Sequence, residues 1–87
     1  MVDEEALSWR AIKPGHKVLG REGQIGTVHR VLADYGADIF HGVSLRRGLL
    51  GPELEITADH IERISSDSLW TALGAHEVED LPAARGG

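Results

Sequence analysis

The chain has 87 residues, a net charge of −5 and no cysteine. This length is enough for one small domain with a thin core, and the lack of cysteine excludes a disulfide framework or a thiolate metal site. No apolar run approaches the ~20 residues of a membrane span, and the acidic start of the chain is unlike a signal peptide. We therefore expect a cytoplasmic protein without a membrane span.

The charge is distributed unevenly along the sequence. Residues 13–47 sum to +3, whereas residues 48–87 sum to −6. Two surface patches of opposite sign are one interpretation. An ordinary solvated surface is the other, because strands from both halves of the chain would mix in a closed sheet.

Residues 15–32 predict two strands joined by a tight turn. Gly23 ends the segment Arg21-Glu22-Gly23 between them and can adopt the positive φ that a short hairpin needs. Apolar residues fall on both faces of the second strand, residues 24–32, so we expect a bulge or a bend near Gly26.

Four more short strands follow the hairpin, at residues 39–46, 53–57, 61–64 and 68–73. Alternation in the first of these puts His41 in an apolar row with Ile39 and Val43, and it puts Phe40 on the outward row. Residues 74–82 change to a helical period, with Gly74 as the cap and Pro82 as the end.

Short strands separated by turns are typical of a sandwich or a barrel. We therefore predict an all-β fold, a small six-stranded β-barrel with a short C-terminal helical turn. The domain is expected to span residues 12–82, between a flexible segment at 1–11 and a disordered tail at 83–87. Trp9 is expected to cover one end of the core.

Three passages of the chain resemble a known family. They read IKPG followed by KVLGREGQIGTVHRV, then DIFHGVSLRRGLLGPELEITADHIERI, and then SLWTALGAHEVEDLP. In order and spacing they are similar to the PRC-barrel family, which is named for the cytoplasmic domain of the photosynthetic reaction-centre H subunit. The C-terminal domain of the ribosome maturation factor shares that fold. The resemblance implies a six-stranded barrel that serves as a binding or adaptor module, with no shared catalytic residues and no obligatory cofactor.

The chain has five histidines, and two of them are candidates for a pair. Pairing about the centre of the turn at 33–38 would place His29 opposite His41 on the neighbouring strand. Ordinary cross-strand packing is one interpretation. A metal site is another, although it would need a third ligand, and a buried pair could also make stability fall below about pH 6. We predict no metal site and no cofactor.

No catalytic constellation is recognisable. The acids at Glu53 and Glu55 are predicted on an exposed strand face, and those at 77–80 on a terminal helical turn, where a solvated surface is the simpler interpretation. The sequence lacks a glycine-rich phosphate loop and a nucleophile elbow. We therefore predict that the protein is not an enzyme.

The favoured function is a protein-interaction or adaptor module of the PRC-barrel type, with an unidentified protein partner or a second copy of the chain. Its expected contact surface consists of Phe40, Arg46, Arg47, Leu49 and Leu50. The alternative is an RNA- or ribosome-associated domain that uses a basic face. That face would consist of Lys17, Arg30, Arg46 and Arg47.

Overall fold

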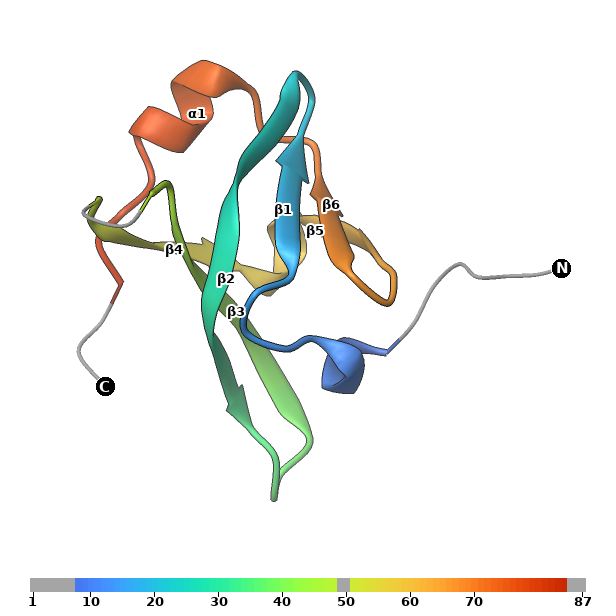
Figure 1. Cartoon of the computed structure of the whole chain (residues 1–87). Coiled ribbons are helices and arrows are strands. Elements are labelled where there is room, and N and C mark those ends of the chain that lie inside the picture. Colours follow the sequence, from blue (N-terminus) through green and yellow to red (C-terminus); the bar gives the residue numbers. More distant parts are fainter. Residues whose placement is uncertain (1–7, 49–50, 85–87) are drawn as a thin grey trace, which may run out of the picture.

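A computed structural model describes residues 8–48 and 51–84 of the chain. The elements are, in order, η1 (Trp9–Ala11), β1 (Lys17–Gly20), β2 (Gly23–Asp34), β3 (Ile39–Arg46), β4 (Glu53–Thr57), η2 (Ala58–His60), β5 (Ile61–Ile64), β6 (Ser68–Thr71) and α1 (Ala75–Glu79). The strands form one sheet in the order β4-β3-β2-β1-β6-β5 (Figure 1). Only the β1–β6 pair among these is parallel. The all-β prediction is therefore confirmed.

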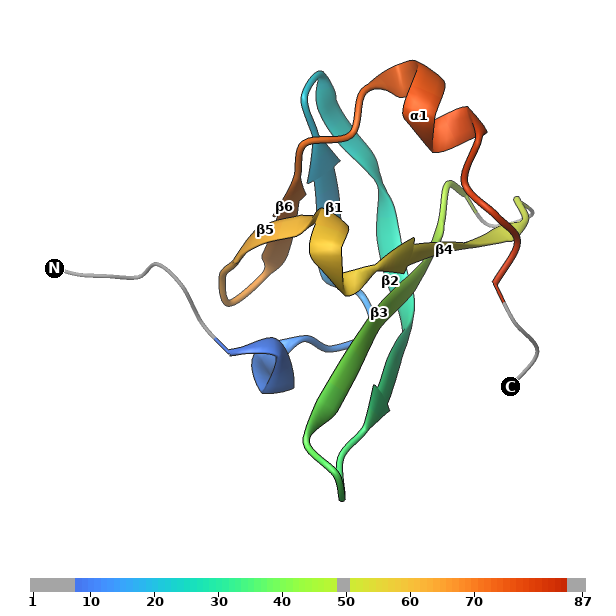
Figure 2. The same ribbon diagram turned by 180° about the vertical axis from the view of Figure 1, so that it is seen from behind.

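The sheet is open in the described part of the chain, because its ladder ends at β4 on one side and at β5 on the other. The predicted closure into a barrel is not shown. The two edge strands are joined by the single turn η2, which lies at the rear of the sheet (Figure 2). The sequence prediction of a closed cylinder rested on strand spacing, which does not determine whether the first and last strands of the order pair.

The outer edge of β4 is covered by the end of the chain. The amide of Glu55 donates to the carbonyl of Pro82 at 2.9 Å, and the amide of Ala84 donates to the carbonyl of Glu53 at 2.9 Å. Ala83 forms a bridge with Leu54 between these two bonds. Ordered pairing thus extends to residue 84, two residues beyond the predicted end of the domain.

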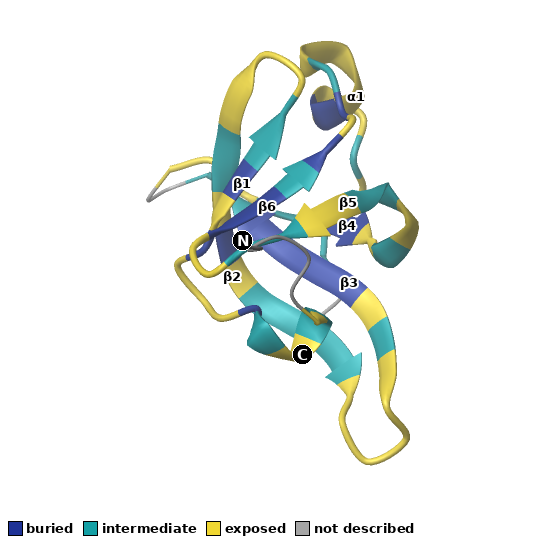
Figure 3. Cartoon of the chain, turned by 90° about the vertical axis from the view of Figure 1, so that its right-hand side faces the viewer, coloured by how far each residue is buried: buried dark blue, intermediate teal, exposed yellow. Residues whose placement is uncertain are grey.

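Side chains from five strands and from α1 share one core, which shows that the sheet is curved. The buried apolar residues are Ile12, Val18, Val28, Val43, Leu45, Ile56, Leu69, Leu73 and Val78. The second half of β3 is fully enclosed, since Val43, Ser44 and Leu45 each have 0% exposure. Alternate residues of a strand face opposite sides, so β3 is covered on both of its faces (Figure 3).

Bulges bend the long strand β2. Opposite β1, the register shifts so that Ile25 is the extra residue, directly before Gly26. Opposite β3, His29 is a second extra residue. Gly23 has a φ of 126° at the turn into β2. The predicted bend near Gly26 and the predicted turn glycine are both confirmed.

A third bulge corrects the predicted faces of β3. His41 is the extra residue, because Leu32 pairs with Gly42 while the next residue of β2, Ala33, pairs with Phe40. The bulge exposes His41 and shifts the side chains before it to the other face. The predicted His29–His41 pair is therefore wrong, because both histidines are exposed bulge residues and the register does not place them opposite each other.

The helical turn at the C-terminus is built as the sequence indicates. A carboxylate oxygen of Glu77 accepts from the amide of Gly74 at 2.8 Å, and Val78 is fully buried. The turn between β1 and β2 contributes Glu22, which accepts from the amide of Ala75 at 3.0 Å. These bonds satisfy amides at the start of α1 that lack an intrahelical partner. In the described residues, no helix is long and apolar enough to cross a membrane.

We expect Gly42→Ala to destabilise the fold strongly. Gly42 has a φ of 144°, and a Cβ there would lie 2.0 Å from the carbonyl oxygen of Ile56 on β4. Backbone strain and the displacement of β4 together predict a loss of about 3 kcal/mol or more in the free energy of unfolding. Urea unfolding measures it. Gly36→Ala is the matched control, because its Cβ would meet only an Asp34 side-chain oxygen at 3.6 Å, and an equal loss in both variants would contradict the account.

Stability is expected to fall on acidification below about pH 4.5, near the ordinary carboxyl pKa values. Hydroxyl groups of Ser68 and Ser65 lower the pKa of Asp67, and the amide of Gly74 lowers the pKa of Glu77. The folded state binds these protons less tightly than the unfolded state, so the stabilisation is present above the unfolded pKa and is lost as the pH falls through the folded pKa.

Thermal unfolding followed from pH 7 to pH 3 measures this dependence. The melting temperature should stay nearly level down to about pH 5 and then decline. A decline completed between pH 7 and pH 5 would indicate histidine titration instead, and it would contradict the carboxylate account.

Candidate interaction sites

The predicted contact residues lie at opposite ends of β3. Phe40 is near the start of the strand and Arg46 is its last residue. At roughly 3.3 Å per residue they are about 20 Å apart. The structure therefore holds two separate surfaces in place of one. Arg47 follows directly after β3, and Leu49 and Leu50 of the predicted surface lie outside the described residues.

The first surface is at the tip of the β2–β3 hairpin, and we call its residues Trp9, Arg10, Tyr35 and Ile39 the hairpin patch. Tyr35 and Ile39 are the exposed large hydrophobic residues of the described chain, at 51% and 47% exposure. The Trp9 ring tilts against the Tyr35 ring with centroids 5.1 Å apart. The turn η1 thus joins the hairpin and widens its apolar tip.

Phe40 supports this patch from below and is not an outward contact residue. It is half-buried against the core, and its ring stacks on Trp9 with centroids 5.4 Å apart and planes 6° apart. The prediction that Phe40 points outward is wrong, because the bulge at His41 reverses the alternation in the first part of β3. The same bulge explains why Ile39, predicted in the inward row, is exposed.

Arg10 fastens η1 to the hairpin. Its guanidinium lies 4.8 Å from the Trp9 centroid and 5.6 Å from the Tyr35 centroid. The same group donates to Asp38 Oδ1 at 3.0 and 3.2 Å and to the carbonyl oxygen of Tyr35 at 3.1 Å. Several weak contacts on one guanidinium hold the patch in a single arrangement, even though the Arg10–Asp38 ion pair itself is exposed.

The second surface is an open groove of about 680 Å³ between the first half of β2 and the end of β3. We call it the basic groove. Its lining residues are Gln24, Ile25, Gly26, Thr27, His29, Arg46, Arg47 and Gly48. Gly26 allows the two strands to meet at the floor, because a Cβ there would lie 2.4 Å from the carbonyl oxygen of Arg46.

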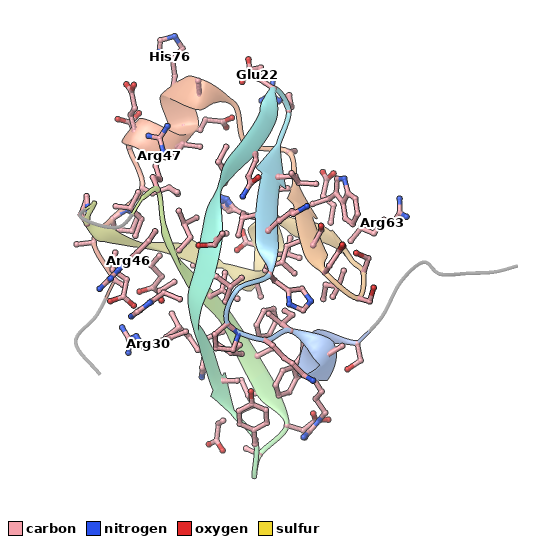
Figure 4. All side chains as sticks on the ribbon, in the orientation of Figure 1. Glu22, Arg30, Arg46, Arg47, Arg63 and His76 are labelled. Atoms are coloured by element: carbon pink, nitrogen blue, oxygen red, sulfur yellow. The ribbon has the colours of Figure 1, made fainter. Side chains whose placement is uncertain are left out.

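Register places part of the predicted basic face in one row. Lys17 pairs with Thr27, and Thr27 pairs with Arg46. Residues paired across neighbouring strands point to the same face, so Lys17 shares a face with Arg46. Arg47, Arg46 and Arg30 lie on the same side of the molecule, with Arg47 nearest α1 (Figure 4).

Arg30 forms an ion pair and a hydrogen bond within the chain, so it adds little uncompensated positive charge to this face. Its Nε lies 2.7 Å from Glu53 Oε2, and its amide donates to the Ser44 hydroxyl at 3.0 Å. The Ser44 hydroxyl and then Arg30 hold the pKa of Glu53 below its ordinary value. The predicted RNA-binding face therefore loses one of its four cations to a cross-strand ion pair.

The same network corrects the prediction that the acids of β4 lie on an exposed face. The Glu53 side chain is only 22% exposed, and Glu55 is 7% exposed. Arg30 covers one of them, and residues 82–84 pass along the edge of the strand. Alternation alone could not indicate this, because the covering segments come from elsewhere in the chain.

A further hollow of about 370 Å³ lies between β4 and α1. Its lining includes the acids Glu55, Glu77 and Asp80 together with His60. In residues 8–48 and 51–84, no group of three or more potential ligand residues is arranged to hold a metal ion.

Sequence reasoning missed three of the four residues of the hairpin patch. Tyr35 was part of a segment interpreted only as a polar turn, although a large aromatic residue in a turn is itself a signal of a contact. Arg10 and Ile39 carried no such signal, because their positions depend on the docking of η1 and on the bulge.

No protein-family model matches this sequence, and a search of the curated proteins finds no match either. The likeness to the PRC-barrel family therefore rests on the sequence motifs quoted above alone.

Proposed function

We propose that this domain is a non-catalytic protein-interaction module of the PRC-barrel type that works in the cytoplasm. The observation that carries the proposal is the hairpin patch, in which the exposed Tyr35 adjoins a tryptophan and an arginine, and Ile39 is exposed on the same hairpin. Tryptophan, tyrosine and arginine are the residues most enriched where protein interfaces derive their binding energy.

The rigidity of the patch supports a binding role. The Arg10 contacts and the Trp9–Phe40 stack already order the side chains in the free protein. A partner would therefore lose less conformational entropy on binding than it would with a mobile loop. An exposed patch without this support would be a weaker candidate.

We propose further that the curved sheet is a small barrel of the PRC type. Core side chains from five strands converge, and the edge strands β4 and β5 are joined by one short turn. This curvature is what a small barrel needs. In such a fold side chains fill the interior, so binding would use the outer surface.

We expect a photo-crosslinking amino acid at position 35 to capture a partner protein in the cell. The matched control carries the same amino acid at His76, which is exposed on α1 at the other end of the molecule. A product that forms from position 35, and not from position 76, agrees with the proposal. Equal products from both positions, or none from position 35, would contradict it.

A second copy of the chain is one candidate partner for the patch. If the domain self-associates there, light scattering during size-exclusion chromatography should show a mass that rises with concentration. The double variant Tyr35→Ser, Ile39→Ser should then remain a folded monomer with only a modestly lower melting temperature, because both side chains are about half exposed and the Tyr35 ring contacts surface groups of Trp9 and Arg10. A monomer at all concentrations would leave a different protein as the partner.

A further inference from the structure

We infer that the basic groove binds an acidic segment of a partner protein, and that the carboxylate side chains of this segment contact the groove. The groove is at the far end of β3 from the hairpin patch. It is therefore a second site, with a chemistry of its own, and either site could function without the other.

Two arginines in the groove lack the partners that the other described arginines have. Arg10, Arg21 and Arg30 each bind a carboxylate, and Arg63 lies over the Trp70 ring at 4.6 Å. Arg46 and Arg47 have no ion pair within residues 8–48 and 51–84, and both line the same groove. His29 is beside them, and the described lining contains no aspartate or glutamate.

The guanidinium of Arg46 has a hydrogen-bond donor without a partner. Its Nε is buried and has no hydrogen-bond partner in the described chain. A buried donor without a partner lowers stability, and a carboxylate can accept from Nε and a terminal nitrogen of the same guanidinium at once. Because this Nε is buried, a carboxylate would reach it only after the Arg46 side chain rotates outward, and it would then satisfy a donor that the folded chain leaves without a partner.

The shape of the groove favours a peptide over an isolated anion. A volume of about 680 Å³ is open to solvent along the strand, which is more space than one carboxylate fills. Ile25 offers an apolar contact, and the side chains of Gln24 and Thr27 offer hydrogen-bonding groups. These groups can contact the backbone and the uncharged side chains of an extended segment.

The lining also favours a peptide over RNA. The described lining contains no phenylalanine, tyrosine or tryptophan ring on which a base could stack, and the imidazole of His29 is the single ring it offers. Beyond the groove, the positive charge of Arg30 is neutralised by Glu53, so the groove does not continue into a longer track of free cations in that direction.

A titration of the ¹⁵N-labelled full chain with a capped oligoglutamate peptide at low salt and about pH 7, where glutamate is ionised, tests the inference. Saturable amide shifts should be confined to residues 24–29 and 46–48. The same peptide with glutamine in place of glutamate should cause none. The double variant Arg46→Gln, Arg47→Gln should bind at least about tenfold more weakly, since each lost charge-assisted bond removes roughly that much affinity.

The matched control is Lys13→Gln, Arg63→Gln, which removes the same charge from exposed positions outside the groove. It should bind the peptide like the natural chain. Equal weakening in both double variants would overturn the inference, because it would show unspecific attraction. The absence of saturable shifts would also overturn it.

Two other probes test whether the groove binds a different class of ligand. If inorganic phosphate saturates the same amides as strongly as the peptide, the groove is a small-anion site and the inference is wrong. If oligouridylate binds there more tightly than the peptide at equal salt, the groove is a nucleic-acid site and the inference is also wrong. The variant Tyr35→Ser, Ile39→Ser should bind the peptide unchanged, so a failed titration does not affect the cross-linking result at position 35.

Discussion

The close contact between β3 and β4 at Gly42 is the constraint on which the rest of the structure depends. A carbonyl of β4 occupies the space that a side chain of residue 42 would need. This contact brings Ile56 beside Val43 on the core face and Glu55 beside Ser44 on the opposite face. Because β3 is buried on both faces, the two ends of the strand are held at a constant separation, and each end carries one of the two proposed surfaces.

An ion pair and a hydrogen bond lie on the face of β3 that is opposite the core. Arg30 pairs with Glu53 across β3, and the Ser44 hydroxyl beside it accepts from the Arg30 amide. This network uses one cation of the first half of the chain and one acid of the second half. Arg46 at the end of β3 and Arg47 directly after it have no such partner in the described residues. The uneven charge along the sequence thus becomes a local excess of donors in one groove.

The strand positions could be predicted from the sequence because turns and apolar alternation are local properties. The predicted bounds of β3, β4 and β5 agree with the structure, as does the Gly74 cap of α1. The sequence wrongly suggested that His29 and His41 pair, because each is an extra residue in a bulge and alternation assumes that bulges are absent. Phe40 and Ile39 were assigned to the wrong faces for the same reason. The hairpin patch could not be predicted either, because it forms only when η1 packs against the hairpin, and these two segments are distant in the sequence.

Native-state hydrogen exchange tests the central role of β3 most directly. The account predicts that the slowest amides are those of Val43, Ser44 and Leu45 together with their neighbours on β2 and β4, and that these exchange only by global unfolding. The amides of β5, at the open edge of the sheet, should exchange faster through local opening. If β5 or α1 were protected more strongly than β3, the strand would not be the element that holds the two surfaces in place, and the account would be contradicted.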